Sequence, residues 1–474
     1  MSHDSPEESS VRYNLYFISA VCLVATMGGL LFGYDWVVIG GAKPFYEPHF
    51  SIGEHTPYLQ GFTQSSALLG CIAGAIISGL ISDRYGRKRM LFFAATLFSL
   101  SAIGTAFSWD LTSFNCFRWV GGVGIGIASN MSPMYIAELS PAKYRGRFVS
   151  FNQLAIVIGV LAAQTTNWLI AESVTAEATP DMIRESWNGL YGWRYMFGFE
   201  VVPALLFFLL MFFVPESPRW LVKFGRDEEA ARVLKAVGGE SYANQEIANI
   251  HHTLRKEEIS QVHLGDLFEP ALFKVLMLGC FLAFFQQWCG INVIFNYAEE
   301  VFKAAGYAVD AVMFNIVITG LVMLAATFIA IFTVDKYGRR VLMLIGAVGL
   351  AMIYALLGTG YFLDSKGIHM LLLVMLAVGC YSMSLAPITW VVISEIFPNR
   401  IRGAAVSVAV LFLWVGCTAL TFTFPILNKH LGTYGTFWLY GGICAFGAIV
   451  IFFKLPETKG KTLEEIEQSL LGEE

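Results

Sequence analysis

Apolar residues along this chain come in long runs, and most polar and charged residues fall between them. Each run holds roughly 20 residues, enough for a helix to cross about 30 Å of hydrocarbon. The pattern therefore predicts twelve membrane-spanning helices. Their expected ranges are 14–42, 58–81, 90–108, 112–136, 148–171, 194–213, 271–300, 311–334, 341–362, 369–393, 403–424 and 435–454.

A polar stretch, 216–268, separates the first six predicted spans from the last six. Within it, Asp227–Gly239 begins with acids, carries a lysine late and ends in glycines, which is how a short helix starts and stops. Ile247, Ile250 and Leu254 follow the spacing of an amphipathic helix. The stretch is therefore predicted to be a helical linker packed under the bundle.

Composition agrees with a polytopic membrane protein. The 474 residues are 56% hydrophobic and only 14% charged, whereas about a quarter of the residues in a soluble domain are charged. Short loops after the second, fourth, eighth and tenth predicted spans hold twelve basic residues, against six on the opposite side. Basic loops remain in the cytoplasm, so both termini and the linker are expected there. Residues 1–12 are polar and acidic, unlike a secretory signal, so the first span is expected to stay in place.

The sequence gives little indication of disulfides, metal binding, catalysis or nucleotide binding. The eight cysteines lie in or beside apolar runs without metal-ligand spacing, so neither disulfides nor a metal site is expected. The spans hold no buried nucleophile–base pair, and an enzyme is not expected. The glycines of Gly121–Gly126 fall inside a predicted span and follow no strand, which indicates helix packing rather than a nucleotide site.

Three motifs occur twice, in the same order and about 250 residues apart, and they indicate two homologous six-helix halves. The pairs are Asp83–Lys88 with Asp335–Arg340, Ala137–Gly146 with Ser394–Gly403, and Val214–Arg219 with Leu455–Gly460.

The charged residues of these motifs are expected to form an ion network at the cytoplasmic helix ends of each half. Such networks can hold the halves together when that side is closed; alternatively, they only anchor the topology. The first set is Asp83, Arg84, Arg87, Glu138, Arg145 and Glu216, and the second is Asp335, Arg339, Glu395, Arg402 and Glu457.

The motifs resemble those of the major facilitator superfamily, and of its sugar porter branch in particular. The matching segments are Gly79–Lys88, Arg118–Gly126, Pro133–Glu138, Pro215–Trp220, Gln286–Asn292 and Pro456–Gly460. The resemblance covers about residues 14 to 465 and is strongest to bacterial proton symporters of xylose and hexoses. It implies an all-α fold of two pseudo-symmetric six-helix halves around a central sugar site. The expected divisions are a cytoplasmic tail (1–13), the first half (14–215), the cytoplasmic helical linker (216–270), the second half (271–456) and a cytoplasmic tail (457–474).

A neutral sugar is bound by amides, which hydrogen-bond its hydroxyls, and by aromatic rings, which cover its C–H faces. Several such residues lie at membrane depth and match positions of the family's sugar site, although the tryptophans could serve packing alone. The candidates are Phe32, Gln153, Gln286, Gln287, Asn292, Asn296, Tyr297, Trp390 and Trp414.

The chain departs from the xylose-type pattern at four positions of the family's sugar site. Val160, Met323 and Leu413 stand where relatives carry amides, and Asn296 stands where they carry a tyrosine. An unmatched hydroxyl in a dry site costs on the order of 1–3 kcal/mol. The resemblance therefore does not identify the sugar.

Accumulation of an uncharged sugar needs a coupling ion, and Asp35, Arg118 and Glu200 are ionisable groups within the spans. Paired with Arg118, Asp35 stays ionised; when the pair separates, desolvation favours the protonated acid. Movement of the first span against the fourth would then change proton affinity. Symporters of the family carry an acid at the Asp35 position, and Glu200 also matches a symporter acid. The alternative is a static structural ion pair.

Together these features predict proton-coupled import of a pentose or hexose across the cytoplasmic (inner) membrane by alternating access. The expected partners are the monosaccharide, the proton and the lipid bilayer, with no nucleic acid, no cofactor besides the coupling proton, and a monomeric chain. A facilitative uniporter of the same fold is the main alternative. A transporter-like sugar receptor is a distant one, because such receptors carry long cytoplasmic tails.

Overall fold

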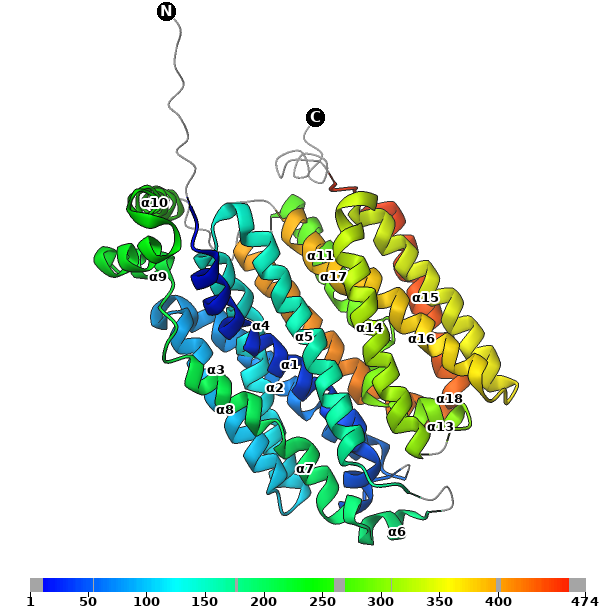
Figure 1. Cartoon of the computed structure of the whole chain (residues 1–474). Coiled ribbons are helices and arrows are strands. Elements are labelled where there is room, and N and C mark those ends of the chain that lie inside the picture. Colours follow the sequence, from blue (N-terminus) through cyan, green and yellow to red (C-terminus); the bar gives the residue numbers. More distant parts are fainter. Residues whose placement is uncertain are drawn as a thin grey trace, which may run out of the picture.

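The computed structural model describes residues 12–53, 55–174, 178–259, 269–307, 309–397 and 402–459, and every element in these ranges is helical (Figure 1). In chain order the elements are α1 (Leu15–His49), α2 (Pro57–Tyr85), α3 (Arg87–Ala106), α4 (Leu111–Leu139), α5 (Ala142–Ile170), α6 (Pro180–Glu185), η1 (Asn188–Gly192), α7 (Trp193–Gly198), α8 (Val201–Leu210), α9 (Pro218–Lys223), α10 (Asp227–Ile259), α11 (Pro270–Trp288), α12 (Ile291–Asn296), α13 (Ala298–Ala304), α14 (Val309–Tyr337), α15 (Arg339–Phe362), α16 (Ile368–Met383), α17 (Leu385–Ile396) and α18 (Arg402–Lys454).

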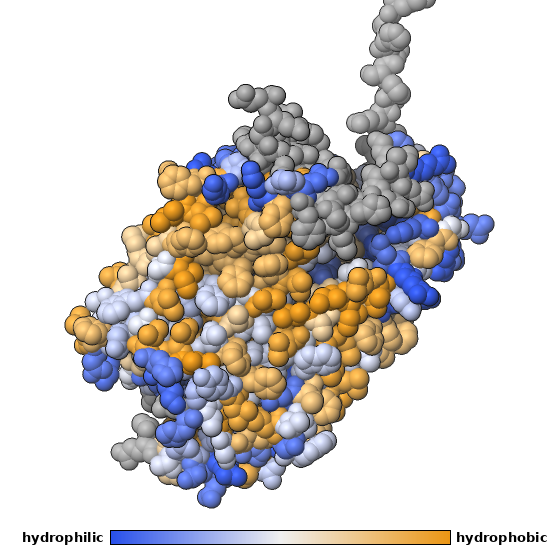
Figure 2. Space-filling view, turned by 180° about the vertical axis from the view of Figure 1, so that it is seen from behind, coloured by the Kyte–Doolittle hydropathy of each residue, from blue (hydrophilic) through white to orange (hydrophobic). Residues whose placement is uncertain are grey.

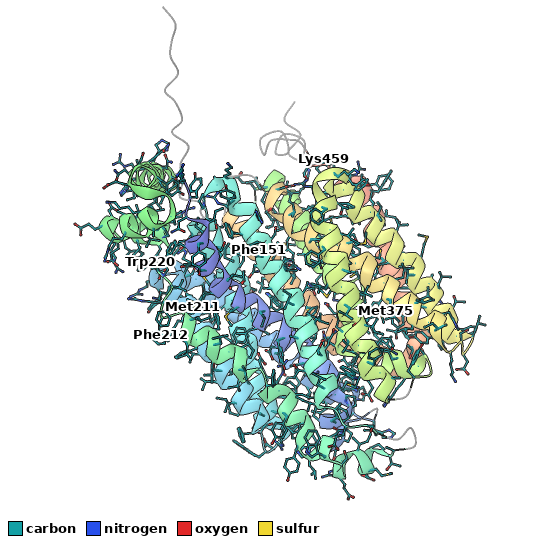
Figure 3. The ribbon with its side chains drawn as sticks, viewed as in Figure 1. Phe151, Met211, Phe212, Trp220, Met375 and Lys459 are labelled. Atoms are coloured by element: carbon teal, nitrogen blue, oxygen red, sulfur yellow. The ribbon has the colours of Figure 1, made fainter. Side chains whose placement is uncertain are left out.

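The long helices run roughly side by side in two groups, α1–α8 (the first half) and α11–α18 (the second half) (Figure 1). The start of α1 lies at the same end of the bundle as Lys459 (Figures 1 and 3). We call this end the terminal face, and the opposite end, which carries α6 and α13, the far face.

Hydrophobic side chains cover the middle of the bundle on the face shown in Figure 2, and hydrophilic ones gather toward its two ends. Apolar side chains also lie on the outer surface of the bundle. Met211 is fully buried, whereas its neighbour Phe212 points outward from the bundle and is 58% exposed (Figure 3). Large apolar side chains exposed on this scale suit a lipid solvent rather than water. The predicted class, an all-α polytopic membrane protein, is confirmed.

Ten helical stretches in the described residues are long and apolar enough to cross a membrane. One of them, α18, comprises two helices that meet at a kink at Gly432, where the backbone has φ +68°. The glycine-rich α4, with 29 residues, is a further long helix of the bundle. Counting α18 twice and adding α4 gives the twelve predicted spans.

Three predicted spans are broken within the bundle. The span predicted over 271–300 divides into α11, α12 and α13, with a left-handed Gly290 (φ +89°) at the first break and Tyr297 at the second. Ser384 separates α16 from α17, and η1, α7 and α8 replace one predicted span. Broken helices line the substrate sites of many transporters, because unwound backbone is tolerated in a membrane only where it faces protein or a cavity.

The linker forms helices as predicted. Helix α10 contains two helices joined at Gly239, whose φ is +84°, and α9 precedes them. Trp220 of α9 is buried beside the apolar residues of α10, including Ile247 and Leu254 from the predicted amphipathic stripe. The backbone N–H of Asn14 donates to the carbonyl of Val237 (2.8 Å), which ties the linker to the start of α1.

One boundary prediction is wrong in an instructive way. The first span is predicted to end at residue 42, which would place Lys43 in the loop that follows; instead α1 continues to His49 through Pro44 and Pro48. Lys43 is only 2% exposed. A buried ammonium group is tolerated there because carboxylates surround it, a feature that sequence spacing does not reveal.

Candidate functional site

Asp35 and Arg118 form a buried ion pair between α1 and α4. The Arg118 Nη1 contacts the Asp35 carboxylate, and its Nη2 donates to the Asp35 backbone carbonyl (3.1 Å). Both side chains are at most 2% exposed. The glycines of α4 allow the approach: a Cβ built on Gly121 would lie 3.1 Å from the second Asp35 carboxylate oxygen. The predicted pair is therefore present in the structure.

Glu200 is the third ionisable group of this centre. It is 2% exposed, and its carboxyl group interacts with that of Asp35. One oxygen of each carboxyl group has no partner. Two buried acids thus lie near one guanidinium, which contacts Asp35, so one proton would balance their charge. Adjacent carboxyl groups in a dry site behave in this way because both cannot ionise freely.

A small cavity of about 10 Å³ connects this centre with the second half. Its lining includes Arg118, Trp36 and Gln64 from the first half and Asn296 from the second. A cavity of this size holds about one water molecule, so no sugar fits it in the present conformation. Trp36 and Gln64, which the sequence analysis did not single out, therefore lie between the ion pair and the opposite half.

The predicted amides of the second half lie close together. Asn292 Nδ2 donates to Gln287 Oε1, and Gln287 Nε2 donates to Gln286 Oε1 (3.2 Å). Gln286 Nε2 in turn donates to the carbonyls of Leu385 (3.2 Å) and Ala386 (3.1 Å) at the start of α17. The amide chain thus connects both broken helices, and sugar hydroxyls would have to compete with these hydrogen bonds.

Aromatic residues from the two halves meet beside the amides. The Phe32 ring lies 5.6 Å from the Trp414 ring, and Trp36 lies 5.8 Å from Phe295. Trp414 is buried, and its indole N–H has no partner. This arrangement can cover an apolar sugar face and still offer one donor.

The remaining predicted sugar ligands stand apart from this group in different ways. Tyr297 donates its hydroxyl hydrogen to the carbonyl of Thr421 (2.7 Å) and packs on Phe424, so its polar group is already engaged. Asn296 lines the small cavity, and its Oδ1 has no partner. Gln153 and Trp390 are both half-buried. The structure thus brings Phe32 together with Trp414, and Gln286 together with Gln287 and Asn292.

At the terminal face, the first-half motifs form the predicted ion network in part. Arg87 contacts Asp83 (3.1 Å) and Glu138 (3.0 Å). Glu216 accepts the backbone N–H groups of Arg87 (3.0 Å) and Lys88 (3.0 Å) at the start of α3, and that of Ser217 (2.8 Å) just before α9. Burial raises the pKa of Glu216, although these N–H groups act in the opposite direction.

The second half repeats this geometry, as a duplication requires. Glu457 accepts the backbone N–H groups of Arg339 (2.8 Å) and Arg340 (3.2 Å), and Arg339 pairs with Glu395 (3.1 Å). The preceding glycines correspond as well: Gly86 and Gly338 have φ of +92° and +91°, and each lies against the glutamate of its own cluster.

Two predicted members lie outside the network. Arg84 lies over the ring of Tyr85, and Arg145 donates to the carbonyl of Ala137 (3.0 Å). The side chains of Asp335 and Arg402 fall outside the described part of the chain. The ion pairs described above each join side chains of one half.

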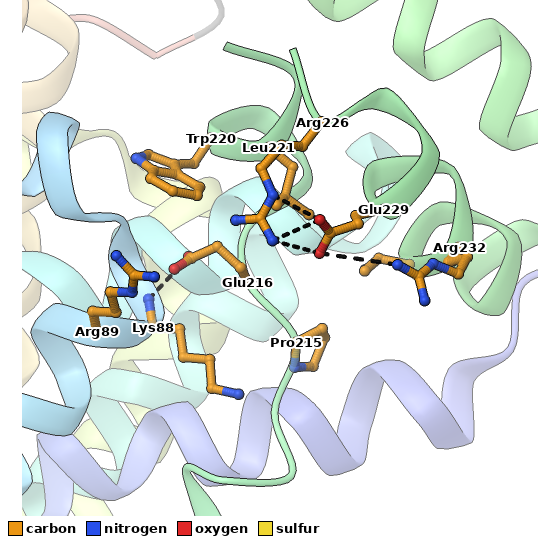
Figure 4. A pocket seen from close by; sticks show the side chains of 10 residues that line it. Lys88, Arg89, Pro215, Glu216, Trp220, Leu221, Arg226, Glu229 and Arg232 are labelled. Carbon is orange, nitrogen blue, oxygen red and sulfur yellow. Dashed lines mark hydrogen bonds and ion pairs between the residues drawn. The ribbon is translucent and has the colours of Figure 1, made fainter. Parts of the chain in front are cut away.

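A much larger pocket lies elsewhere in the described part of the chain. It has a volume of about 480 Å³ and is formed where Glu216 and Lys88 face the linker residues Trp220, Arg226 and Glu229 (Figure 4). It lies at the terminal face beside the linker, away from Asp35 and the amide chain. Pocket volume alone is therefore a poor guide here, and the buried ion pair, amides and aromatic rings remain the candidate site.

Comparison with known proteins gives a consistent result. The family model "Sugar (and other) transporter" matches residues 21–470. The D-xylose-proton symporter of Escherichia coli (strain K12) is 40% identical, with 97% of this chain and 96% of that protein aligned. The arabinose-proton symporter of Bacillus subtilis is 38% identical, with 96% of each chain aligned.

Two further comparisons extend this range. The glucose transport protein of Synechocystis is 37% identical over 98% of this chain and 99% of that protein. Among solved structures, the partially occluded inward-open conformation of the xylose transporter XylE from E. coli aligns with a TM-score of 0.82 at 38% identity. That alignment covers 94% of this chain and 100% of the solved one.

Proposed function

Because this chain belongs to the sugar (and other) transporter family, we propose that it imports a monosaccharide together with a proton, by alternating access. The terminal face lies in the cytoplasm and the far face outside, as the basic loops indicate. The relatives carry pentoses and a hexose according to their names. The substrate class is therefore a neutral pentose or hexose.

The observation that carries the proton-coupled reading is the buried centre of Asp35, Arg118 and Glu200. A permanently static ion pair would be a weak stabilising device in a membrane interior. Two acids around one guanidinium instead provide a place for one exchangeable proton. Asp35 is the coupling acid, Arg118 its counter-ion, and Glu200 a second carboxyl group that tunes or relays the proton.

Coupling follows from the position of this centre. Asp35 lies on α1 three residues beyond Phe32, whose ring contacts Trp414 of the second half. A sugar between Phe32 and the amides of α11 and α12 would change the contact between the halves. Movement of α1 against α4 would change the Asp35–Arg118 separation, so sugar and proton bias the same conformational equilibrium.

The amides and rings described above form the sugar site in this proposal, with Gln153, Trp390, Asn296 and Tyr297 as further contacts. Val160, Met323 and Leu413 are all buried and apolar. They narrow the set of hydroxyls that the site can satisfy. A counterflow screen of pentoses and hexoses in liposomes would identify the preferred sugar.

The decisive experiment replaces Asp35 by asparagine in proteoliposomes. The expected result is that Asp35→Asn exchanges sugar across the membrane but no longer accumulates it under an inward proton gradient. Asp364→Asn is the matched control, because Asp364 is an exposed carboxylate on the far face; it should accumulate sugar normally. Undiminished proton-driven accumulation by Asp35→Asn would overturn the mechanism. A wild-type protein that moves sugar without alkalinising the external medium would be a facilitative uniporter instead.

A further inference from the structure

The far face holds a second buried charge cluster that the transport mechanism above does not use. Lys43 of α1 lies between three carboxylates: Glu47 on its own helix (3.1 Å), and Glu299 (3.7 Å) and Glu300 on α13 of the second half. The pairs of Lys43 with Glu299 and Glu300 connect the two halves directly. We call these four residues the far-face cluster.

Charge is unbalanced in this cluster. Three carboxylates surround one buried ammonium group. Among the described residues, the one further cation in an ion pair with them is Lys303, which is 46% exposed and pairs with Glu299 one helical turn away. Lys43 and Glu47 have side chains less than 10% exposed. An excess negative charge in such a site is strongly disfavoured unless it is paired or neutralised.

Hydrogen bonding points to the same excess. The amide of Gln60 on α2 donates to Glu47 (3.1 Å) and more weakly to Glu300 (3.4 Å). The second carboxylate oxygens, Glu47 Oε1 and Glu300 Oε2, are buried and have no donor. Glu47 as a whole is 7% exposed. A buried acceptor without a donor is costly, and a proton added to one of these oxygens removes both the excess charge and one unmatched acceptor.

The other titratable groups nearby are already engaged. Tyr46 accepts from Gln64 (2.8 Å), and Tyr297, whose ring lies 5.8 Å from Lys43 Nζ, donates to Thr421. His49, two residues beyond Glu47, faces Arg194 (3.4 Å). A metal cation would meet the ammonium group of Lys43 in the centre of the cluster, whereas a proton adds to a carboxylate oxygen. The proton is therefore the ligand that this chemistry favours.

We propose that the far-face cluster is a second proton-binding site, distinct from Asp35, which takes up one proton when the two halves close on this face. Opening the face separates α1 from α13 and hydrates the carboxylates, so the proton leaves to the same side. Because the closed state binds the proton more tightly, acid favours closure and alkali favours opening. The assignment of this side to the exterior rests on the orientation given in the proposed function. Proton binding by the cluster does not depend on that orientation.

Uptake of one proton on closure changes the closed-to-open ratio by up to about tenfold per pH unit. Spin labels at His55→Cys and Leu363→Cys, both exposed on the far face in opposite halves, report this ratio as a distance distribution in lipid nanodiscs without sugar. The exposed Cys116 is replaced by serine. Asp35→Asn and Glu200→Gln are included, so that the coupling centre does not titrate.

In this background the closed fraction is expected to rise as the pH falls from 8 to 5. Adding Glu47→Gln and Glu300→Gln together should abolish the pH response. The two carboxyl groups that carry the oxygens without donors are then neutral amides, which do not bind a proton between pH 5 and 8. Lys43→Met should open the face at pH 8 and leave closure dependent on acid. Lys303→Met is the matched control: it also removes a lysine that contacts Glu299 but no contact between halves, and should keep the response.

A background protein whose distances do not change with pH would overturn the proposal, as would a pH response that persists in the double glutamine variant. A response that follows sodium concentration at constant pH would assign a metal cation instead and also overturn it. Since no sugar or proton gradient is used, these outcomes are independent of whether the proposed symport is correct.

Discussion

Glycines at the contact of α2 with α4 allow a sharp test of how the first half is packed. A Cβ built on Gly74 of α2 would lie 2.2 Å from the backbone carbonyl oxygen of Val123 on α4. Real Cβ contacts stay beyond 3.0 Å, so Gly74→Ala requires a separation of at least 0.8 Å, the difference between these distances. Backbone atoms lie on both sides, so no flexible side chain can give way.

Overpacking of this kind costs about 1–3 kcal/mol. Gly79 is the matched control, because it lies five residues further along the same helix and a Cβ there meets nothing within 4 Å. Alanine is about 1 kcal/mol more favourable than glycine in a helix interior, so Gly79→Ala should be neutral or stabilising. Because the propensity gain is common to both substitutions, they should differ by the overpacking cost alone, about 1–3 kcal/mol.

The assay is thermal unfolding of both purified variants in the same detergent, followed by the loss of monodisperse protein. We expect a lower Tm than wild type for Gly74→Ala and an unchanged or higher Tm for Gly79→Ala. Equal Tm values for the two variants would refute the close approach of α2 and α4. So would recovery of the Gly74→Ala defect by a substitution that leaves this contact untouched.

Three further substitutions test other parts of the structure. Arg87→Gln should destabilise by about 3–5 kcal/mol because it leaves the largely buried Glu138 without its cation, whereas Arg84→Gln should have little effect; thermal unfolding compares them. Trp220→Ala leaves a cavity between α9 and α10 and should destabilise the packing of the linker by about 3–5 kcal/mol. The linker should become more sensitive to limited proteolysis, while the rate of sugar exchange is unchanged. Asn292→Ala removes the amide that donates to Gln287, and the lost hydrogen bond should weaken sugar binding by about 1–3 kcal/mol. The half-saturation concentration of sugar in counterflow should then be roughly 5- to 150-fold higher. Unchanged half-saturation would remove this residue from the sugar site.

Much of the fold was accessible from the sequence because a membrane imposes a simple rule. Every backbone polar group in hydrocarbon must be paired within its own segment, so long apolar runs become helices of predictable length. The repeated loop motifs indicated the duplication, and the structure repeats it down to Glu216 and Glu457 at the starts of corresponding helices. The Asp35–Arg118 pair was also predictable, because a buried charge requires a partner and few are present.

Helix breaks were not predictable from apolar runs. Gly290 and Ser384 interrupt segments whose hydrophobicity is continuous, and the break at Ser384 is held by Gln286 from another helix. Long-range hydrogen bonds of this kind leave no local pattern. The same reason explains why Tyr297, expected to contact sugar, was not recognised as a donor to Thr421.

The membrane class, the two halves and the buried pair of Asp35 with Arg118 follow from the sequence, because hydrophobic length, repetition and the rarity of buried charge can be seen along the chain. Tertiary structure decided which charges meet. Only the packing of α1 against α13 shows that Lys43 lies inside the bundle among Glu47, Glu299 and Glu300 rather than in a loop. Residues about 250 positions apart compensate one another there, and such compensation depends on distance in space, which spacing along the chain does not encode.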